Sequence, residues 1–212
     1  LSVSRLDATE QYKGQDHVLE ALAQLRQTHP QLEFRYTIQG DGSDRPRLEA
    51  LARELGLGEI TRFTGSVKDR TELENLYAQS DLFVLPSRYG RWQRKWRGEG
   101  FGIVYLEAAA FGVPSLAYDC GGVKDIFTSE KDGWLAAPDD IPALAQALAT
   151  LAQDRTRLAA LGRAAKARTE VFTKRSVARE WAAAATQLKA LRPGKVKASQ
   201  SQRPFVQPQP AP

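Results

Sequence analysis

Two glutamates flank a glycine-rich segment near the middle of the chain. Glu99 and Glu107 stand eight positions apart in RGEGFGIVYLEAA, residues 97–109, and an apolar, alanine-rich stretch follows the glycines. Such a stretch is typical of a helix, and the free amides at a helix N-terminus attract anions. Carboxylates placed there could form an acid–base pair or bind ligand hydroxyl groups. Each also has a structural alternative, Glu99 as a favourable charge at the helix start and Glu107 as a surface acid of the helix.

Glycine-bearing turns follow predicted strands at four places. Glycine lets the backbone approach a ligand and present N–H groups to it, although a single glycine at a strand end is ordinary in turns. The carboxyl ends of parallel strands meet at one edge of a sheet, and ligands of open α/β proteins bind there. Four such turns together favour a phosphate-bearing ligand. They are Gly40-Asp41-Gly42, Gly65-Ser66-Val67, Gly98 to Gly102, and Gly121-Gly122.

Several kinds of phosphate and metal site are absent from the sequence. It contains no P-loop motif, the glycines of GEGFGIV are one residue short of a kinase glycine loop, and the dinucleotide-binding glycine spacing is missing. With no Asp-x-Asp pair, one cysteine and two histidines, it offers no evident metal-ligand set. A diphosphate bound without metal needs protein cations. Arg5, after the first predicted strand, and Lys13, before the first predicted helix, are candidates, with solvated surface cations as the alternative.

Short β-type runs alternate with amphipathic helical patterns over most of the chain. This alternation predicts the α/β class: a doubly wound, Rossmann-like parallel sheet flanked by helices, followed by C-terminal helices. The run at 81–87 is continuous in apolar residues, as expected of a strand buried on both faces. Strands are predicted over 1–6, 33–40, 60–65, 81–87, 115–119 and 133–137, and helices over 14–28, 70–80, 123–128 and 140–191, with further helices ending before Gly56 and Gly112.

The composition is that of a globular protein. Hydrophobic residues make up 42% of the 212 residues and charged residues 26%, and no apolar run approaches the roughly 18 residues that span a bilayer. A single cysteine, Cys120, fits a reducing compartment, so we expect a cytoplasmic protein, with the inner face of the membrane as a further option. The lack of methionine and the strand-like start at Leu1 predict that the chain is part of a longer protein.

The formal net charge of +5 is concentrated in two segments. Residues 88–97 contain five basic residues, residues 192–212 contain four, and neither segment contains an acid. The rest of the chain is net acidic, so a nucleic-acid-binding face is not indicated. Residues 192–212 are rich in Pro, Gln and Ser with little apolar area to bury, and we predict a disordered tail there.

Six blocks of sequence together resemble a known family. They occur in the order SRL…YKGQDHVLEAL, IQGDG…RLEALARELGL, RFTGSV, LYAQSDLFVLPS, EGFGIVYLEAAAFGVP and CGGVKDIF…DGWL. The chain resembles the C-terminal, donor-binding domain of family 4 retaining glycosyltransferases of the GT-B fold, and Glu99 and Glu107 form the most specific of the matching motifs. The resemblance implies a nucleotide-sugar-binding Rossmann-like domain over 1–191 and an N-terminal acceptor domain that lies outside this chain.

The resemblance also implies roles for individual residues. Arg5, Lys13 and Glu99 would form the catalytic set: the two cations neutralise the donor diphosphate and Glu99 faces the hydroxyls of the sugar. Glu107 would accept hydrogen bonds from the ribose. The other donor-binding residues implied are Gly40 and Gly42 on the phosphate side, Ser66 and Val67 near the base, and Gly100, Phe101, Gly102 and Ile103, whose backbone contacts the sugar and phosphates.

The activity implied is retaining transfer of a hexose-type sugar from a nucleotide diphosphate sugar, without a metal or other cofactor. The acceptor is open among a lipid, a polysaccharide and a small molecule. Because the family's acceptor domain carries a catalytic histidine, we expect this chain alone to be inactive. A non-catalytic nucleotide-sugar-binding module and another GT-B enzyme, such as a nucleotide-sugar epimerase, stay as alternatives.

One segment departs from the family pattern. The basic stretch RYGRWQRKWRG, 88–98, stands where the family passes within a few residues to Glu-Gly-Phe-Gly. It could be a cleft-edge loop that engages an anionic acceptor or a membrane surface. The pattern favours the alternative, a solvated loop whose Trp92 and Trp96 pack on the body of the protein. We assign His17 and His29 no catalytic role.

Overall fold

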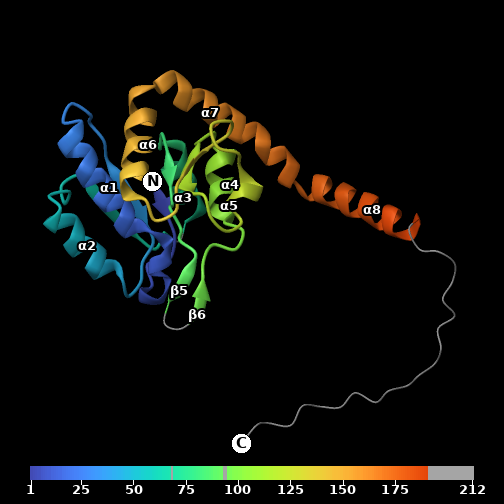
Figure 1. The fold of residues 1–212 in the computed structure, drawn as a ribbon, viewed down its shortest axis with the longest axis horizontal. Helices are drawn as coiled ribbons and strands as arrows, with labels where there is room; N and C mark the ends of the chain where they lie inside the picture. Colours follow the sequence, from blue (N-terminus) through green and yellow to red (C-terminus); the bar gives the residue numbers. More distant parts are fainter. Residues whose placement is uncertain (68, 93–94, 191–212) are drawn as a thin grey trace, which may run out of the picture. The chain divides into compact units, whose positions relative to one another are not determined.

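The computed structural model describes residues 1–67, 69–92 and 95–190, and the chain divides into two units. The larger unit, Leu1–Phe172, is an α/β domain (Figure 1). The second unit begins at Thr173. Among the described residues, no helix combines the length and the apolar character needed to cross a membrane.

Six parallel strands form the framework of the larger unit. They pair as two three-stranded groups, β1-β2-β3 and β4-β7-β8. The Val84 amide donates to the Leu1 carbonyl at 2.8 Å and the Ser2 hydroxyl donates to the Val84 carbonyl, so β1 also lies beside β4. The strand order is therefore β3-β2-β1-β4-β7-β8. The strands are β1 (Ser2–Val3), β2 (Tyr36–Gln39), β3 (Thr61–Gly65), β4 (Phe83–Val84), β7 (Ser115–Tyr118) and β8 (Trp134–Ala136).

Helices cover both faces of these strands (Figure 1). Apolar side chains of α1 and α6, among them Leu19 and Leu144, join one core cluster, whereas Tyr77 of α3 and Tyr105 of α4 join another. All four residues of β7 are buried and three of them are apolar, as expected of a strand covered on both faces. The helices are η1 (Ala8–Lys13), α1 (Gln15–Thr28), α2 (Arg45–Glu54), α3 (Arg70–Ala78), α4 (Ile103–Ala110), α5 (Val123–Ile126), α6 (Ile141–Gln153), α7 (Arg155–Arg168) and η2 (Thr169–Phe172).

The predicted class, a doubly wound parallel sheet between two layers of helices, is confirmed, and each of the six predicted strands is present in shortened form. The helical stretch predicted over 140–191 is divided, because Asp154 ends α6 and caps α7 by accepting from the Arg157 amide at 2.8 Å. In the second unit, α8 (Lys174–Ala190) begins after Thr173, whose hydroxyl accepts from the Ser176 amide. The tail predicted over 192–212 lies outside the described residues.

The prediction of a loop at 88–98 is wrong. Strands β5 (Gly90–Trp92) and β6 (Lys95–Arg97) form an antiparallel hairpin that projects from the domain (Figure 1). Trp96 stacks on Tyr89 with 5.5 Å between ring centroids, and these side chains are 65% and 61% exposed. Trp96 therefore does not pack on the body of the protein, and the prediction for the Trp92 side chain lies outside the described part of the structure.

Candidate functional site

The site lies at the point where the strand order reverses direction. From β1 the chain continues to β2 on one side, whereas β4 continues to β7 on the other, and crevices at such switch points bind ligands in open α/β sheets. The segment after β1 carries Arg5 and Lys13. The segment after β4 carries Glu99 and leads into α4 at Ile103.

The backbone after β1 is held tightly against the end of β4. Asp7 caps η1 by accepting from the Thr9 amide at 2.8 Å. At the other end of η1, Gly14 has φ of 80°, and a Cβ there would lie 2.3 Å from the Pro86 carbonyl oxygen. Only glycine fits this left-handed, close-packed position. Lys13, the residue before it, is thereby fixed beside the end of β4.

Lys13 and Glu99 are brought into direct contact. The Lys13 ammonium donates to Glu99 Oε2 at 2.7 Å, and the two side chains are only 15% and 13% exposed. The buried Ser87 hydroxyl lies 3.5 Å from the same oxygen. The Cys120 thiol donates to the Ser87 carbonyl at 2.9 Å, which ties this residue to the turn after β7. A mostly buried cation and carboxylate therefore share the end of β4.

Arg5 is not drawn into this pair. Its guanidinium makes an ion pair with Glu10, and its side chain is 79% exposed. Glu10 itself is buried, and its Oε2 has no hydrogen-bond partner among the residues that the structure describes. Arg5 and Lys13 thus lie in the same segment after β1, as predicted, but their side chains pair with different carboxylates, Glu10 and Glu99.

The N-terminus of α4 starts with a glycine in a special conformation. Gly102 has φ of 78°, and a Cβ there would lie 2.5 Å from the ring of Tyr105, whose hydroxyl donates to the Leu85 carbonyl at 2.7 Å. Gly122 approaches the Gly100 carbonyl so closely that a Cβ would lie 2.1 Å from its oxygen. Two of the predicted glycine turns therefore pack against each other. The neighbouring side chains of Phe101 and Ile103 are exposed.

Glu107 lies one helical turn further along α4. It accepts from the Tyr77 hydroxyl of α3 at 2.9 Å. Burial, and next the charge of Glu107, raise the pKa of Tyr77 far above its usual range, so this hydroxyl stays a donor. The pKa of Arg70 is raised mainly by its hydrogen bond to Glu74, and Glu107 adds to the effect. Glu107 thus contacts α3 through Tyr77, near the end of that helix.

The turns after β1, β2 and β3 lie side by side. The Gly40 amide donates to the Gly65 carbonyl at 3.1 Å. A Cβ on Gly40 would lie 1.8 Å from the Ser4 carbonyl oxygen, and one on Gly42 would lie 2.3 Å from that of Leu6. Three of the segments predicted to contact a donor therefore meet at one edge of the sheet.

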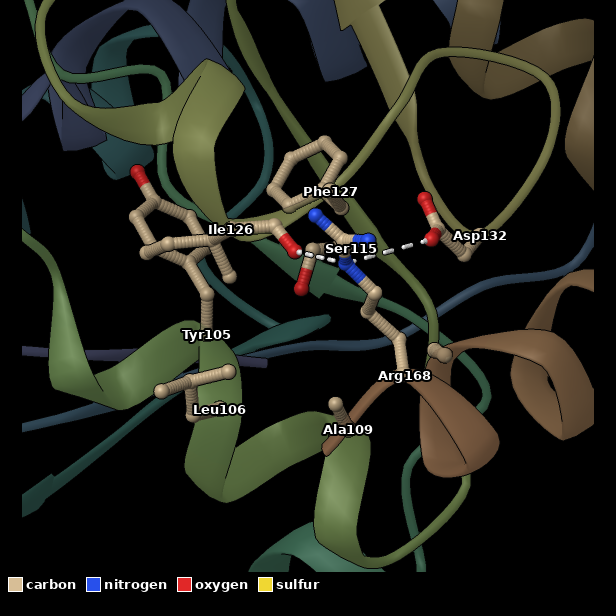
Figure 2. Close-up of a pocket in the computed structure, with 9 residues that line it drawn as sticks. Tyr105, Leu106, Ala109, Ser115, Ile126, Phe127, Asp132 and Arg168 are labelled. Atoms are coloured by element: carbon tan, nitrogen blue, oxygen red, sulfur yellow. Dashed lines mark hydrogen bonds and ion pairs between the residues drawn. The ribbon is translucent and has the colours of Figure 1, made fainter. Parts of the chain in front are cut away.

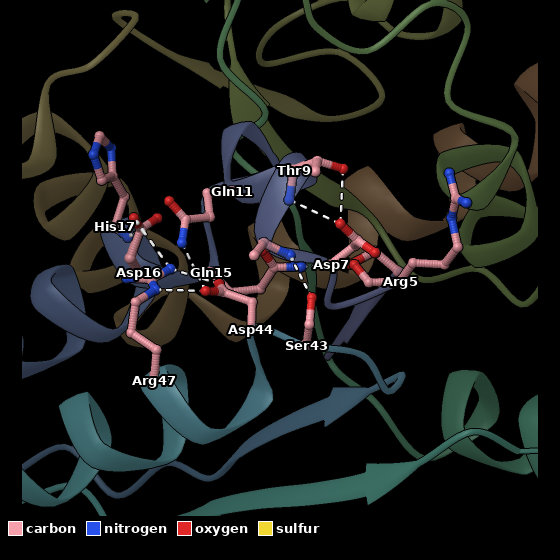
Figure 3. A network of polar contacts seen from close by, with 12 residues as sticks. Arg5, Asp7, Thr9, Gln11, Gln15, Asp16, His17, Ser43, Asp44 and Arg47 are labelled. Atoms are coloured by element: carbon pink, nitrogen blue, oxygen red, sulfur yellow. Dashed lines mark hydrogen bonds and ion pairs between the residues drawn. The ribbon is translucent and has the colours of Figure 1, made fainter. Parts of the chain in front are cut away.

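A polar network around η1 and the start of α1 was not predicted from the sequence, and Figure 3 shows the part of it that surrounds Gln11, Asp16, Asp44 and Arg47. Arg88, counted only as part of a basic segment, donates to the Gln11 carbonyl and pairs with Asp16 at 3.2 Å. Its guanidinium also lies 2.8 Å from His17 Nε2. Burial, and next the charge of Arg88, lower the pKa of His17. Asp44 extends the network by accepting from Gln11 and Arg47 at 2.7 Å.

A small cavity lies elsewhere, between α4, α5 and α7 (Figure 2). Arg168 enters it and forms an ion pair with Asp132 at 3.9 Å. The cavity has a volume of about 10 Å³, at the lower limit for one water molecule, so a nucleotide does not fit in it. Among the described residues, no group of three or more His, Cys, Asp or Glu side chains is placed to hold a metal ion.

Comparison with known proteins agrees with this geometry. The family model described as "Glycosyl transferases group 1" matches residues 1–168. A GDP-mannose-dependent alpha-(1-6)-phosphatidylinositol monomannoside mannosyltransferase of Mycolicibacterium smegmatis is 36% identical over 155 residues, 71% of this chain and 38% of the relative. The chain thus spans less than half the length of this curated relative.

Two solved structures have the same fold. The crystal structure of Anabaena Alr3699/HepE in complex with UDP superposes with a TM-score of 0.71 and 26% identity, over 88% of this chain and 48% of that one. The C-terminal domain of a glycosyl transferase group 1 family protein, LpcC of Francisella tularensis, gives a TM-score of 0.65 and 21% identity. This match covers 80% of the present chain and 84% of the other, so the likeness is to a C-terminal domain taken by itself.

Proposed function

Because this chain belongs to the group 1 glycosyltransferases, we propose that it forms the nucleotide-sugar donor site of a retaining hexosyltransferase. The contact between Lys13 and Glu99 carries the proposal. A cation suited to phosphate and a carboxylate suited to sugar hydroxyls lie 2.7 Å apart at the switch point of the sheet, which supports these roles. Domain boundaries of 1–191 for the donor-binding domain belong to the same proposal.

Lys13 and Arg5 neutralise the donor diphosphate. The diphosphate leaves with additional negative charge when the bond to the sugar breaks, and a positioned cation stabilises that charge in a site shielded from water. Lys13 is held in place by η1, whereas the exposed Arg5 reaches the phosphates by leaving Glu10. These two side chains supply the charge that a metal would otherwise provide, so we propose that binding and transfer need no metal.

Glu99 holds the donor sugar. When the diphosphate takes Lys13, the Glu99 carboxylate is left to accept hydrogen bonds from sugar hydroxyls. The backbone of Gly100, Phe101, Gly102 and Ile103 presents amides to the sugar and phosphates, because the first amides of a helix lack intrahelical partners. The role of Glu99 is therefore to bind and orient, with proton transfer left to other groups.

The remaining contacts follow the edge of the sheet. Glu107 accepts from the ribose hydroxyls, with Tyr77 holding one of its oxygens. Gly40 and Gly42 line the phosphate side, and Ser66 and Val67 contact the base. The relatives' names include GDP-mannose, and the related structures contain UDP, so both nucleotides are reasonable first probes.

Transfer needs a second half of the cleft. We propose that an acceptor-binding domain, preceding this one in the whole protein, supplies the acceptor and the remaining catalytic groups. This chain alone then binds the donor weakly and does not turn over. The single cysteine, Cys120, is a free thiol, in keeping with a cytoplasmic enzyme.

The decisive experiment is calorimetric titration of the chain with UDP and with GDP, each in the presence of EDTA. We expect heat of binding with one of the two, and its loss in Lys13→Ala. Silence with both nucleotides would overturn the donor-site assignment. Joining the chain to an acceptor domain of the family and measuring sugar transfer then separates an enzyme from a non-catalytic binding module, and NMR of the product reports retention.

A further inference from the structure

The basic hairpin, residues 88–98 with the described strands β5 and β6, is unexplained by donor binding. Tyr89, Arg91, Lys95, Trp96 and Arg97 all have a described position, and Lys95, Trp96 and Arg97 are exposed. An exposed aromatic pair among cations is unusual on a domain surface, because large apolar side chains outside the core mark interaction sites. We therefore expect the hairpin to bind another molecule.

The base of this hairpin is joined to the donor site. The Arg88 amide donates to the Tyr12 carbonyl, the residue before Lys13, at 2.7 Å. At the other end, Gly98 packs under the Tyr89 ring and is followed directly by Glu99. The hairpin therefore begins and ends beside Lys13 and Glu99, the ion pair of the candidate donor site.

The two faces of the hairpin have different chemistry. Arg91 and Trp96 are cross-strand partners and share a face, on which Trp96 stacks with Tyr89. Lys95 and Arg97 alternate with Trp96 along β6 and so point to the opposite face. Among the described side chains, one face thus offers flat aromatic rings beside a guanidinium, and the other offers two cations.

We propose that the basic hairpin binds an acidic sugar chain, the acceptor, and presents its end to the donor site. This proposal rests on the proposed function. Aromatic rings pack against the apolar face of a sugar ring, while Arg and Lys pair with carboxylate or phosphate groups on the chain. The combination selects an anionic saccharide over a neutral one.

An anionic membrane surface fits the hairpin less well. Interfacial segments bury an apolar face in the lipid and keep their charges on the opposite face. Cations also occur on both described faces, so no side of the hairpin is free of charge. An anionic polymer that contacts both faces of the hairpin would match cations on both faces.

Binding of a defined probe tests the proposal. Calorimetry of the 212-residue chain records the heat of binding during titration with a hyaluronan hexasaccharide and with the same hexasaccharide after reduction of its carboxyl groups to alcohols. We expect the acidic form to bind about tenfold more tightly. Trp96→Ala and the double variant Lys95→Ala/Arg97→Ala are each expected to weaken its binding about fivefold or more.

Matched controls separate a site from general charge. Trp181→Ala removes another exposed tryptophan, in the second unit, and Lys131→Ala/Arg163→Ala removes two exposed cations far along the sequence from the hairpin. These controls should bind the acidic probe as the unchanged chain does. Equal losses in both double variants, or no effect of Trp96→Ala, would overturn the proposal.

Vesicles and nucleotides complete the test. Trp96-dependent sedimentation with vesicles of phosphatidylcholine and phosphatidylglycerol, without binding of the acidic hexasaccharide, would assign the hairpin to a membrane surface and overturn the proposal. UDP and GDP titrations of the hairpin variants should match the unchanged chain. If the unchanged chain binds neither UDP nor GDP, the donor site is contradicted, whereas binding of the acidic hexasaccharide to the hairpin can still be measured.

Discussion

Lys13 and Glu99, 86 residues apart in the sequence, neutralise each other at 2.7 Å in a setting where little of either side chain reaches solvent. Each is therefore the other's partner before any ligand arrives. Under the proposed function, a diphosphate that takes Lys13 would release Glu99 for a sugar hydroxyl, so that one binding event would prepare the next. Contact between the pair also fixes η1 relative to the start of α4, which makes the pair part of the fold as well as of the site.

Removing one member of this pair should cost stability as well as affinity. Lys13→Ala leaves the Glu99 carboxylate without its partner, and we expect the free energy of unfolding to fall by about 1–3 kcal/mol. Glu99→Gln combined with Lys13→Ala should recover part of the loss, giving a coupling of about 1–3 kcal/mol in a double-mutant cycle. Urea unfolding measures both quantities, with Lys131→Ala as the control. Additive losses would show that the contact contributes nothing of its own.

Glu107 should report on the ribose. If it accepts from the ribose hydroxyls, UDP or GDP, whichever binds, should bind about tenfold more tightly than its 2′,3′-dideoxy form. Glu107→Gln should remove most of this preference, whereas Glu54→Gln, an exposed acid on α2, should keep it. Calorimetry with the two nucleotides gives the ratio. A preference that persists in Glu107→Gln would place the ribose elsewhere.

Gly102 should be intolerant of a side chain. Alanine there would have a Cβ 2.5 Å from the Tyr105 ring and a left-handed backbone, and we expect a loss of about 1–3 kcal/mol in unfolding free energy. Gly100→Ala is the matched comparison, because a Cβ at Gly100 meets nothing within 4 Å. Thermal unfolding of the two variants should differ clearly in midpoint. Similar midpoints would mean that Tyr105 and the start of α4 rearrange freely.

Acid should weaken the fold through His17. Its pKa is lowered from 6.5 by burial and then by Arg88, so the unfolded chain takes up a proton at higher pH than the folded chain. Stability should therefore fall as the pH drops below about 6.5 and continue to fall until the folded histidine itself titrates. His17→Gln should flatten this dependence between pH 5 and 7, and His29→Gln is the control. An unchanged slope in His17→Gln would assign the effect to other groups.

The sequence predicts the fold well because the signals are local. The buried strand β4 lies within a continuous apolar run at 82–86, and Gly56 and Gly112 mark the helix ends, where each adopts a positive φ. The hairpin at 90–97 was missed because arginine, lysine and glutamine are poor indicators of strands. Its connecting residues also lack the Asn-Gly or Asp-Gly pair of a typical hairpin turn.

The candidate site was only partly predictable, for a different reason. The types and spacing of Glu99 and Glu107 can be read from the chain, but the partners of these residues cannot. Lys13 and Tyr77 come to them through long-range packing, and Arg5 takes a local partner, Glu10, five residues away. In the sequence Arg88 cannot be distinguished from the basic residues beside it, although in the structure it joins the start of the hairpin to η1 and α1.

The position of β1 between β2 and β4 has a consequence for how the site comes into being. Leu1 donates its amino group to the Leu82 carbonyl at 2.9 Å across 81 residues of chain, whereas β1 and β2 are separated by less than half that length. Contacts of long sequence separation form slowly, because the loop between them must close first. Lys13 and Glu99 meet only after this closure. Nucleotide binding should therefore recover more slowly during refolding than the helical circular dichroism signal. The rate of its recovery would report when β1 pairs with β4.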